Sequence, residues 1–154
     1  MNQTMNFFSL VQGDVRSVEA LMEAQADGYN ADVAAALRLL LKSGGKRMRP
    51  AVTILIGRML GADPDRLVTL SAAIELLHTA TLVHDDLIDG SLLRRGTPTL
   101  NSQWSAGATV LTGDFLFARA AKLAADTHSI PVTQVFAHTL TVIVDGELTQ
   151  MFAS

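Results

Sequence analysis

Hydrophobic residues recur every three or four positions along most of the chain, which is the spacing of one face of an α-helix. Residues that stop or start helices divide this pattern into six segments. The predicted helices span residues 11–27, 31–42, 51–60, 64–89, 105–125 and 130–152. Nothing shows the strict alternation that a strand requires. The pattern therefore predicts an all-α fold, a helical bundle of about six antiparallel helices.

The boundaries of these segments carry recognisable signals. Gly44 and Gly45 end the second helix, and Pro50 suits the first turn of the third. Asp63 and Pro64 form an N-cap and a first helical position. Residues 90–102 form the one extended loop. The fourth and fifth segments are apolar nearly all round, so we expect them at the centre of the bundle.

Composition narrows the class of protein. The 154 residues fit a single domain, with 49% hydrophobic and 18% charged residues. A net charge of −3 gives no general attraction for nucleic acid, and the lack of cysteine excludes disulfides and thiolate metal sites. The first 14 residues do not resemble a signal peptide, and charges interrupt the apolar runs. We expect a cytoplasmic protein with no membrane span.

A group of carboxylates at the end of the fourth helix is the strongest chemical feature. Asp85 and Asp89 lie one turn apart on one helix face, and Asp86 flanks them. Like charges at this spacing are unfavourable, the more so near a helix C-terminus, which prefers cations. Clustered oxygen ligands suit magnesium, which shares its coordination with substrate phosphates. A solvated acidic helix end is the alternative interpretation.

Two basic segments could hold a diphosphate. Arg94 and Arg95 follow the carboxylates within the loop, and a guanidinium pairs bidentately with phosphate oxygens. Gly44 and Gly45 precede Lys46 and Arg49 in a segment where the backbone can approach an anion closely. Its spacing is not that of a Walker P-loop. Ordinary surface charge and a plain turn between helices remain the alternatives.

His78 lies two turns before Asp85 and points towards the same side of the helix. With Glu75 it forms half of the Glu-x-x-His motif of di-iron bundles. That interpretation requires a second copy, and no other histidine has a glutamate three positions earlier. A histidine satisfied within the core is the simpler alternative.

Taken in order, five segments resemble the polyprenyl synthetase family, whose members are trans-prenyl diphosphate synthases. The segments are GGKRMRP, LHTATLVHDDLID, LRRGTPTLN, GDFLFARA and DGELTQ, and the resemblance covers residues 37–150. It implies the N-terminal half of the isoprenoid synthase fold. It also implies condensation of isopentenyl diphosphate with an allylic prenyl diphosphate, with Mg²⁺ as cofactor.

The resemblance assigns roles to individual residues. It implies that Asp85 and Asp89 bind magnesium, with Asp86 in the same catalytic motif. Arg94 is implied in binding the allylic diphosphate. The residues implied for isopentenyl diphosphate are Lys46, Arg49, His78 and Arg95. Glu147 and Gln150 match a further family pattern and are expected to face the cavity.

The family also suggests where chain length is decided. Leu77, Ala80 and Thr81 precede the aspartates and correspond to the floor that receives the growing tail. Enzymes of the family that make short products place an aromatic ring near the last two positions. The small side chains of Ala80 and Thr81 therefore predict a medium-length or long product.

The family pattern continues for about the same length again and includes a second aspartate-rich motif. No such motif occurs in this sequence after Asp89. We expect residues 1–154 to be one truncated synthase domain, inactive alone, forming a homodimer or associating with a C-terminal half. A fragment, a split enzyme and a ligand-binding remnant all fit. A regulatory subunit of a heteromeric synthase is the main alternative function. A terpene cyclase is disfavoured by GGKRMRP, and a purely structural bundle leaves the charges unexplained.

Overall fold

The computed structural model describes residues 7–153, and within them the predicted all-helical bundle is confirmed. Residues 1–6, which belong to the 14 residues that bear on a signal peptide, lie outside this range. The helices are η1 (Phe7–Leu10), α1 (Gln12–Ala24), α2 (Ala31–Lys42), α3 (Met48–Met59), α4 (Pro64–Asp89), α5 (Leu100–Gln103), α6 (Ala106–Asp126) and α7 (Ile130–Phe152). Two short strands, β1 (Leu93–Arg94) and β2 (Thr97–Pro98), complete the elements.

Side chains at the helix ends explain several of these boundaries. The side chain of Asp63 accepts a hydrogen bond from the Arg66 amide, with Pro64 in the first turn of α4. Asn30 caps α2 in the same way, accepting from the amides of Asp32 and Val33. Gly90 ends α4 with a left-handed φ of 66°, which glycine adopts without steric cost.

The start of α3 differs from the expected one. The helix begins at Met48, three positions before the predicted start, and Pro50 lies in its first turn as expected. The residue before it, Arg47, is left-handed with φ 55° and ψ 36°. A left-handed conformation is uncommon outside glycine, so this backbone must be held by contacts elsewhere.

The segment after α4 is more ordered than the predicted loop. Leu93 pairs with Pro98 and Arg94 with Thr97 in a two-stranded antiparallel hairpin. The Thr99 hydroxyl and the Asn101 amide both donate to the carbonyl of Ser91, at 2.7 and 2.9 Å. The expectation of no strands is therefore wrong for this hairpin, because two residues per strand are too few to show alternation.

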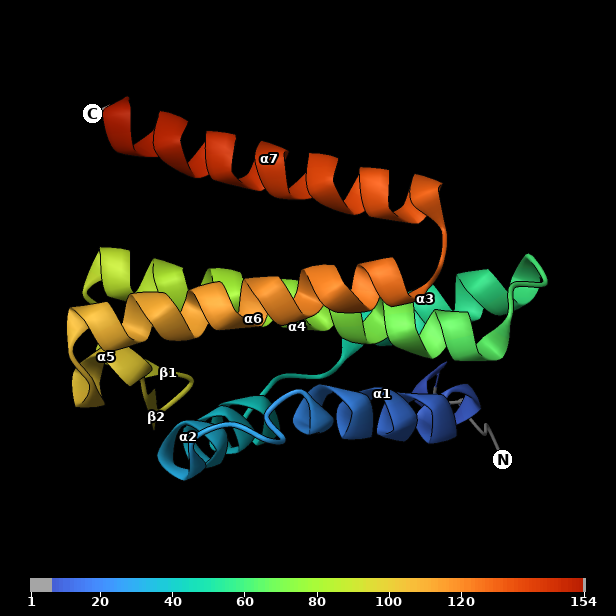
Figure 1. Ribbon diagram of the computed structural model, residues 1–154, viewed down its shortest axis with the longest axis horizontal. Helices are drawn as coiled ribbons and strands as arrows, with labels where there is room; N and C mark the ends of the chain where they lie inside the picture. Colours follow the sequence, from blue (N-terminus) through green and yellow to red (C-terminus); the bar gives the residue numbers. More distant parts are fainter. Residues whose placement is uncertain (1–6, 154) are drawn as a thin grey trace, which may run out of the picture.

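The helices form layers, with α4 and α6 side by side at the centre (Figure 1). α1 and α2 lie on one side of this pair, and α7 runs along the other. Leu76 and Ala80 of α4 and Leu116 and Ala120 of α6 are almost fully buried. The predicted central position of these two apolar segments is thus confirmed. Burying a leucine of this kind contributes about 2 kcal/mol.

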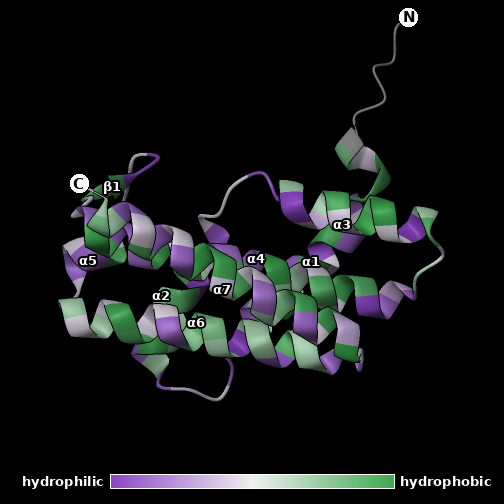
Figure 2. Cartoon of the chain, turned by 90° about the horizontal axis from the view of Figure 1, so that it is seen from above, coloured by the Kyte–Doolittle hydropathy of each residue, from purple (hydrophilic) through white to green (hydrophobic). Residues whose placement is uncertain are grey.

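Apolar residues also remain on the surface. Figure 2 shows several hydrophobic positions along α3. Val52 and Ile56 of this helix are exposed. By length and composition α4 could cross a membrane, although the charge of Glu75 interrupts its apolar run as expected. Half of its apolar window is buried within the protein, which a core helix also shows.

Candidate functional site

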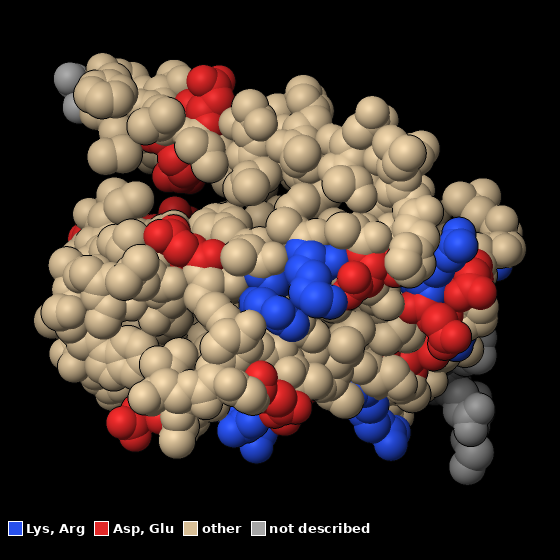
Figure 3. Space-filling view, in the orientation of Figure 1, with Lys and Arg blue, Asp and Glu red and all other residues tan. Residues whose placement is uncertain are grey.

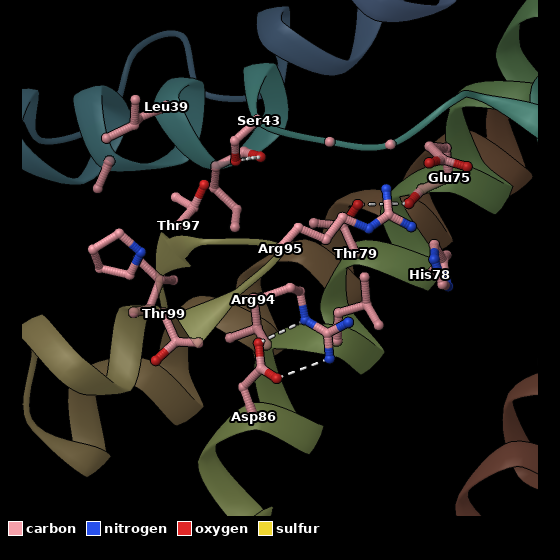
Figure 4. Close-up of a pocket in the computed structure, with 18 of the residues that line it drawn as sticks. Leu39, Ser43, Glu75, His78, Thr79, Asp86, Arg94, Arg95, Thr97 and Thr99 are labelled. Atoms are coloured by element: carbon pink, nitrogen blue, oxygen red, sulfur yellow. Dashed lines mark hydrogen bonds and ion pairs between the residues drawn. The ribbon is translucent and has the colours of Figure 1, made fainter. Parts of the chain in front are cut away.

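A pocket with a volume of about 450 Å³ opens between the α2–α3 loop, the C-terminal half of α4 and the β1–β2 hairpin (Figure 4). The sequence-predicted residues that line it are Lys46, Arg49, His78, Asp86, Arg94 and Arg95. These residues come from three separate segments of the chain. The fold therefore gathers both predicted basic segments at one place, next to the buried aspartate of α4.

Asp86 and Arg94 form the most regular contact in this pocket. The guanidinium donates from Nε and Nη2 to the two carboxylate oxygens, at 2.9 and 2.8 Å. Asp86 is buried, whereas the Arg94 side chain is 41% exposed. The hydrogen bond to Asp86 raises the pKa of Arg94. This contact ties the hairpin to the end of α4 and leaves the edge of the guanidinium open.

His78 lies among positive charges. Burial lowers the pKa of its imidazole, and Arg49, Arg94 and Arg95 lower it further, while Glu75 opposes them. The same guanidinium groups line the pocket. Burial is the largest cause of the lowered pKa, and the arginines add a positive potential, which is the electrostatic environment that an anionic ligand requires.

Asp85 and Asp89 do not line this pocket. Asp85 is half-buried and Asp89 is exposed. Burial is the main cause that raises the pKa of Asp85, and the negative charges of Glu147 and Asp89 raise it further. Figure 3 shows acidic atoms of α7 facing acidic atoms of the layer below across a gap. The predicted carboxylates are therefore divided, with Asp86 on the basic pocket and Asp85 towards α7.

The carboxylates on the α7 side have donor chemistry that suits magnesium. Asp85 and Asp89 offer only oxygen ligands, and the carboxylate of Glu147 adds to the negative charge around Asp85. Within residues 7–153, no three His, Cys, Asp or Glu side chains gather closely enough to hold a metal ion by themselves. These residues therefore fit a magnesium ion that also takes ligands from water or substrate.

The other predicted residues lie apart from the pocket. Leu77 and Ala80 belong to the hydrophobic core, and Thr81 is half-buried with its hydroxyl donating to the His78 carbonyl at 2.6 Å. Gln150 is exposed on α7, whereas Glu147 is half-buried. Neither the chain-length residues nor the α7 pair lines the basic pocket.

One pair of pocket residues was not identified from the sequence. Arg47 is buried and donates from Nη1 to Oε1 of Glu75 at 3.2 Å, and from Nη2 to the carbonyl of Leu41. The sequence offers one signal for this pair: Arg47 is next to Lys46, and Glu75 lies about one helical turn before His78. Gly44 and Gly45 also have a different role from the expected one, since both pack against arginine side chains.

Similarity to known proteins agrees with this arrangement. The chain is 37% identical to heptaprenyl diphosphate synthase component 2 of Geobacillus stearothermophilus, over 94% of this chain and 45% of the relative. It is 35% identical to octaprenyl diphosphate synthase of Escherichia coli K12, over 96% of this chain and 46% of the relative. The chain thus spans about half the length of these relatives.

Solved structures show the same fold. A decaprenyl diphosphate synthase from Rhodobacter capsulatus superposes with a TM-score of 0.89 at 37% identity, over 96% of this chain and 46% of that one. A Caulobacter crescentus polyprenyl synthase, complexed with calcium and isoprenyl diphosphate, gives 0.89 at 40% identity, over 95% and 44%. The bundle and its pocket thus define a protein of the isoprenoid synthase class. The polyprenyl synthetase family model matches residues 30–154, and the chain belongs to that family.

Proposed function

We propose that this chain contributes half of a trans-prenyl diphosphate synthase, which joins isopentenyl diphosphate to an allylic diphosphate and makes a medium-length or long polyprenyl diphosphate. One observation carries the proposal. Basic side chains from three segments converge on one pocket at the end of α4, while Asp85 and Asp89 occupy the other side of that helix end. Two anionic substrates on two sides of one helix end account for both groups.

In this proposal, the basic pocket holds isopentenyl diphosphate. Lys46, Arg49 and Arg95 supply positive charge, and His78 adds a hydrogen-bond donor. After burial, the charges of Arg49, Arg94 and Arg95 lower the pKa of His78, and this positive potential supports an anion at this position. The pocket volume of about 450 Å³ is ample for a five-carbon diphosphate.

The allylic diphosphate takes the other side. Asp85 and Asp89 would hold Mg²⁺, which when bound neutralises the charge of the diphosphate. Arg94 contributes the part of its guanidinium that Asp86 leaves open. The two hydrogen bonds to the Asp86 carboxylate fix the orientation of the Arg94 guanidinium.

The chain's own residues support a simple bond exchange. The allylic C–O bond breaks and its electron pair leaves with the diphosphate, which guanidinium charge stabilises. The double bond of isopentenyl diphosphate supplies the electrons of the new C–C bond, because the pocket holds it near the allylic carbon. The joined carbocation then loses a proton to the released diphosphate, which forms the new double bond of the product. Apolar side chains exclude water that would otherwise capture the cation.

A ligand-binding or regulatory subunit of a heteromeric synthase is the second candidate. Two observations favour it. A relative is named as a component of heptaprenyl diphosphate synthase, and the chain spans about half the length of its relatives. In either case we propose that the chain acts in the cytoplasm, within a homodimer or together with a segment that supplies the second aspartate-rich motif.

Calorimetric titration of the chain with isopentenyl diphosphate tests the binding part of the proposal. Saturable binding is expected, and Lys46→Met or Arg49→Met should weaken it at least about tenfold through lost charge. Lys42→Met is the matched control, because Lys42 is exposed and does not line the pocket. A parent chain that does not bind, or equal losses in all three variants, would contradict the proposal.

Catalysis is tested with farnesyl diphosphate, magnesium and labelled isopentenyl diphosphate, using the chain together with the missing half. Elongated products support the synthase, and cyclic hydrocarbons would contradict it. Products formed only with a distinct partner polypeptide support the subunit alternative.

We also retain Leu77, Ala80 and Thr81 as the proposed floor for the growing tail. Ala80 is fully buried, so a ring there would overpack the core, whereas Thr81 is half-buried and tolerates a larger group more easily. Thr81→Phe in the complete enzyme should shorten the products. Chromatography of the dephosphorylated products measures the effect, and an unchanged profile would refute this assignment.

A further inference from the structure

Arg47 is the most deeply buried cation of the pocket. Its side chain is 8% exposed, and that of its partner Glu75 is 6% exposed. Arg47 belongs to the loop before α3, and Glu75 belongs to α4. Figure 4 shows Glu75 at the wall of the pocket, and Nη1 of Arg47 donates to its Oε1 at 3.2 Å. A second contact joins Arg47 to the carbonyl of Leu41, at the end of α2. The guanidinium therefore connects three elements.

The backbone of Arg47 has the unusual conformation in this loop. Its φ of 55° lies in the left-handed region, and α3 begins with the next residue. The neighbours Lys46 and Arg49 are both exposed and both line the pocket. The side chain of Arg47 is therefore buried, whereas those of Lys46 and Arg49, on either side of it in the sequence, are exposed at the pocket.

The two glycines make room for arginine side chains. A Cβ atom on Gly44 would overlap the guanidinium of Arg47, and one on Gly45 would overlap the guanidinium of Arg95. Neither glycine is among those with a positive φ, so space and not backbone conformation explains them. The loop is therefore shaped to seat one buried and one exposed guanidinium.

The pair is not arranged for stability alone. Nε of Arg47 and Oε2 of Glu75 are buried and have no hydrogen-bond partner in the described structure. A buried ion pair with unsatisfied atoms is no more stabilising than apolar residues of similar volume. The two charges therefore do not serve stability alone. They fix the geometry of the α2–α3 loop.

We propose that Arg47 and Glu75 are positioning residues for the anion pocket: their buried contact locks the α2–α3 loop against α4, so that Lys46, Arg49 and Arg95 surround His78. Neither residue is assigned a direct contact with the diphosphate. This inference rests on the proposed function, because the ligand of the pocket is taken to be isopentenyl diphosphate.

A double variant separates positioning from stability. Arg47→Met with Glu75→Met removes both charges, so no uncompensated charge stays buried and the chain keeps its fold. We expect a thermal midpoint close to that of the parent, together with at least about tenfold weaker binding of isopentenyl diphosphate. The control is Arg38→Met with Asp27→Met, which removes an exposed ion pair and should leave the affinity unchanged.

Gly44→Ala gives an independent test without changing any charge. The new Cβ displaces the guanidinium of Arg47 from Glu75, and the affinity should fall by a similar factor. Gly13→Ala is the matched control, since its Cβ meets nothing within 4 Å. If the double variant does not fold, this variant decides the question.

The outcomes distinguish this inference from the proposed function. Absence of binding by the parent chain would overturn both. Binding by the parent that persists within about twofold in Gly44→Ala, or in the folded double variant, overturns the positioning role alone. Weaker binding in both, with controls at the parent value, supports it.

Discussion

Four arginines surround the basic pocket, and their environments differ. Arg47 is buried against Glu75, and Arg94 is held by both oxygens of Asp86. Arg49 and Arg95 are exposed and lower the pKa of His78 through their charge. The same type of side chain thus serves in this pocket as a structural link and as a source of positive potential.

The Asp86–Arg94 contact should be measurable as stability. Asp86→Asn keeps the shape but removes one charged acceptor, so the free energy of unfolding should fall by about 1–2 kcal/mol. Urea denaturation monitored by circular dichroism measures it. Asp65→Asn, an exposed residue of the same helix, is the control. A loss equal to that of the control would show that the contact contributes nothing.

The lowered pKa of His78 predicts a pH dependence with a definite sign. The unfolded chain binds a proton near pH 6.5, and the folded chain binds it only at lower pH, so unfolding takes up a proton between these values. The contribution of His78 to the free energy of unfolding should be fully present above about pH 6.5 and should decrease as the pH falls below this value. Thermal unfolding at several pH values measures this loss.

His78→Gln should remove part of that pH dependence, whereas His138→Gln, at an exposed position on α7, should not. Inorganic pyrophosphate in the pocket should raise the pKa of His78, because an anion favours the charged imidazole. NMR titration of the ring protons follows it. A pKa that does not respond to pyrophosphate would argue against an anion next to His78.

Charge and spacing singled out Lys46, Arg49, Asp86, Arg94 and Arg95, whereas the role of His78 was implied by the family resemblance; all six residues line the pocket. Arg47 and Glu75 could not be found in this way. Their burial depends on three elements meeting, which no local pattern records. The division of Asp85 from Asp86 was also missed, because it depends on where the hairpin and α7 lie around α4.

The main contact between elements is that of α4 with α6. At this crossing a Cβ on Gly113 would overlap the imidazole of His84, which lies 3.0 Å from the Val110 carbonyl and 3.4 Å from Asp114. The glycine therefore allows the two helices to approach each other next to the aspartates of α4. The distance between these helices sets where Asp85 lies.

Gly113→Ala should lower the free energy of unfolding by about 1–3 kcal/mol, because the added methyl group must displace His84. Gly107→Ala, near the start of the same helix, meets nothing within 4 Å and is the matched control. Differential scanning calorimetry of both variants measures the difference. Equal midpoints would show that the crossing can relax at no cost.

Helix periodicity and capping residues predicted the long elements well, because α2 and α4 have both a clear cap and a clear stop. The β1–β2 hairpin escaped detection. Its order comes from hydrogen bonds of Thr99 and Asn101 to Ser91, which are specific to the folded loop and have no periodicity.

At the scale of the whole molecule, α7 is a long helix that buries little of its surface against the rest of the chain. Phe136 is its one buried residue among those described, and Val135 and Val142 are 65% and 57% exposed. Apolar surface of this extent usually marks an interaction site. We therefore propose that another segment or another copy of the chain packs against this face of α7.

We expect the isolated chain to associate through this surface. Val135→Lys with Val142→Lys should shift it towards monomer, because the two positions lie two turns apart on one face. Sedimentation velocity over a range of concentrations measures the shift. Thr133→Lys with Thr141→Lys adds the same charges at other exposed positions and is the control. An equal shift in the control would mean that charge alone opposes association.

The separation of Asp85 from Asp86 has a mechanical consequence. Successive residues of an α-helix project about 100° apart around its axis, so the two carboxylates cannot be reoriented independently. A twist of α4 that moved Asp85 would also move Asp86 and, through their contact, the guanidinium of Arg94. Torsional rigidity of α4, and not only the chemistry at its tip, therefore determines whether both reactants can be aligned at the same moment.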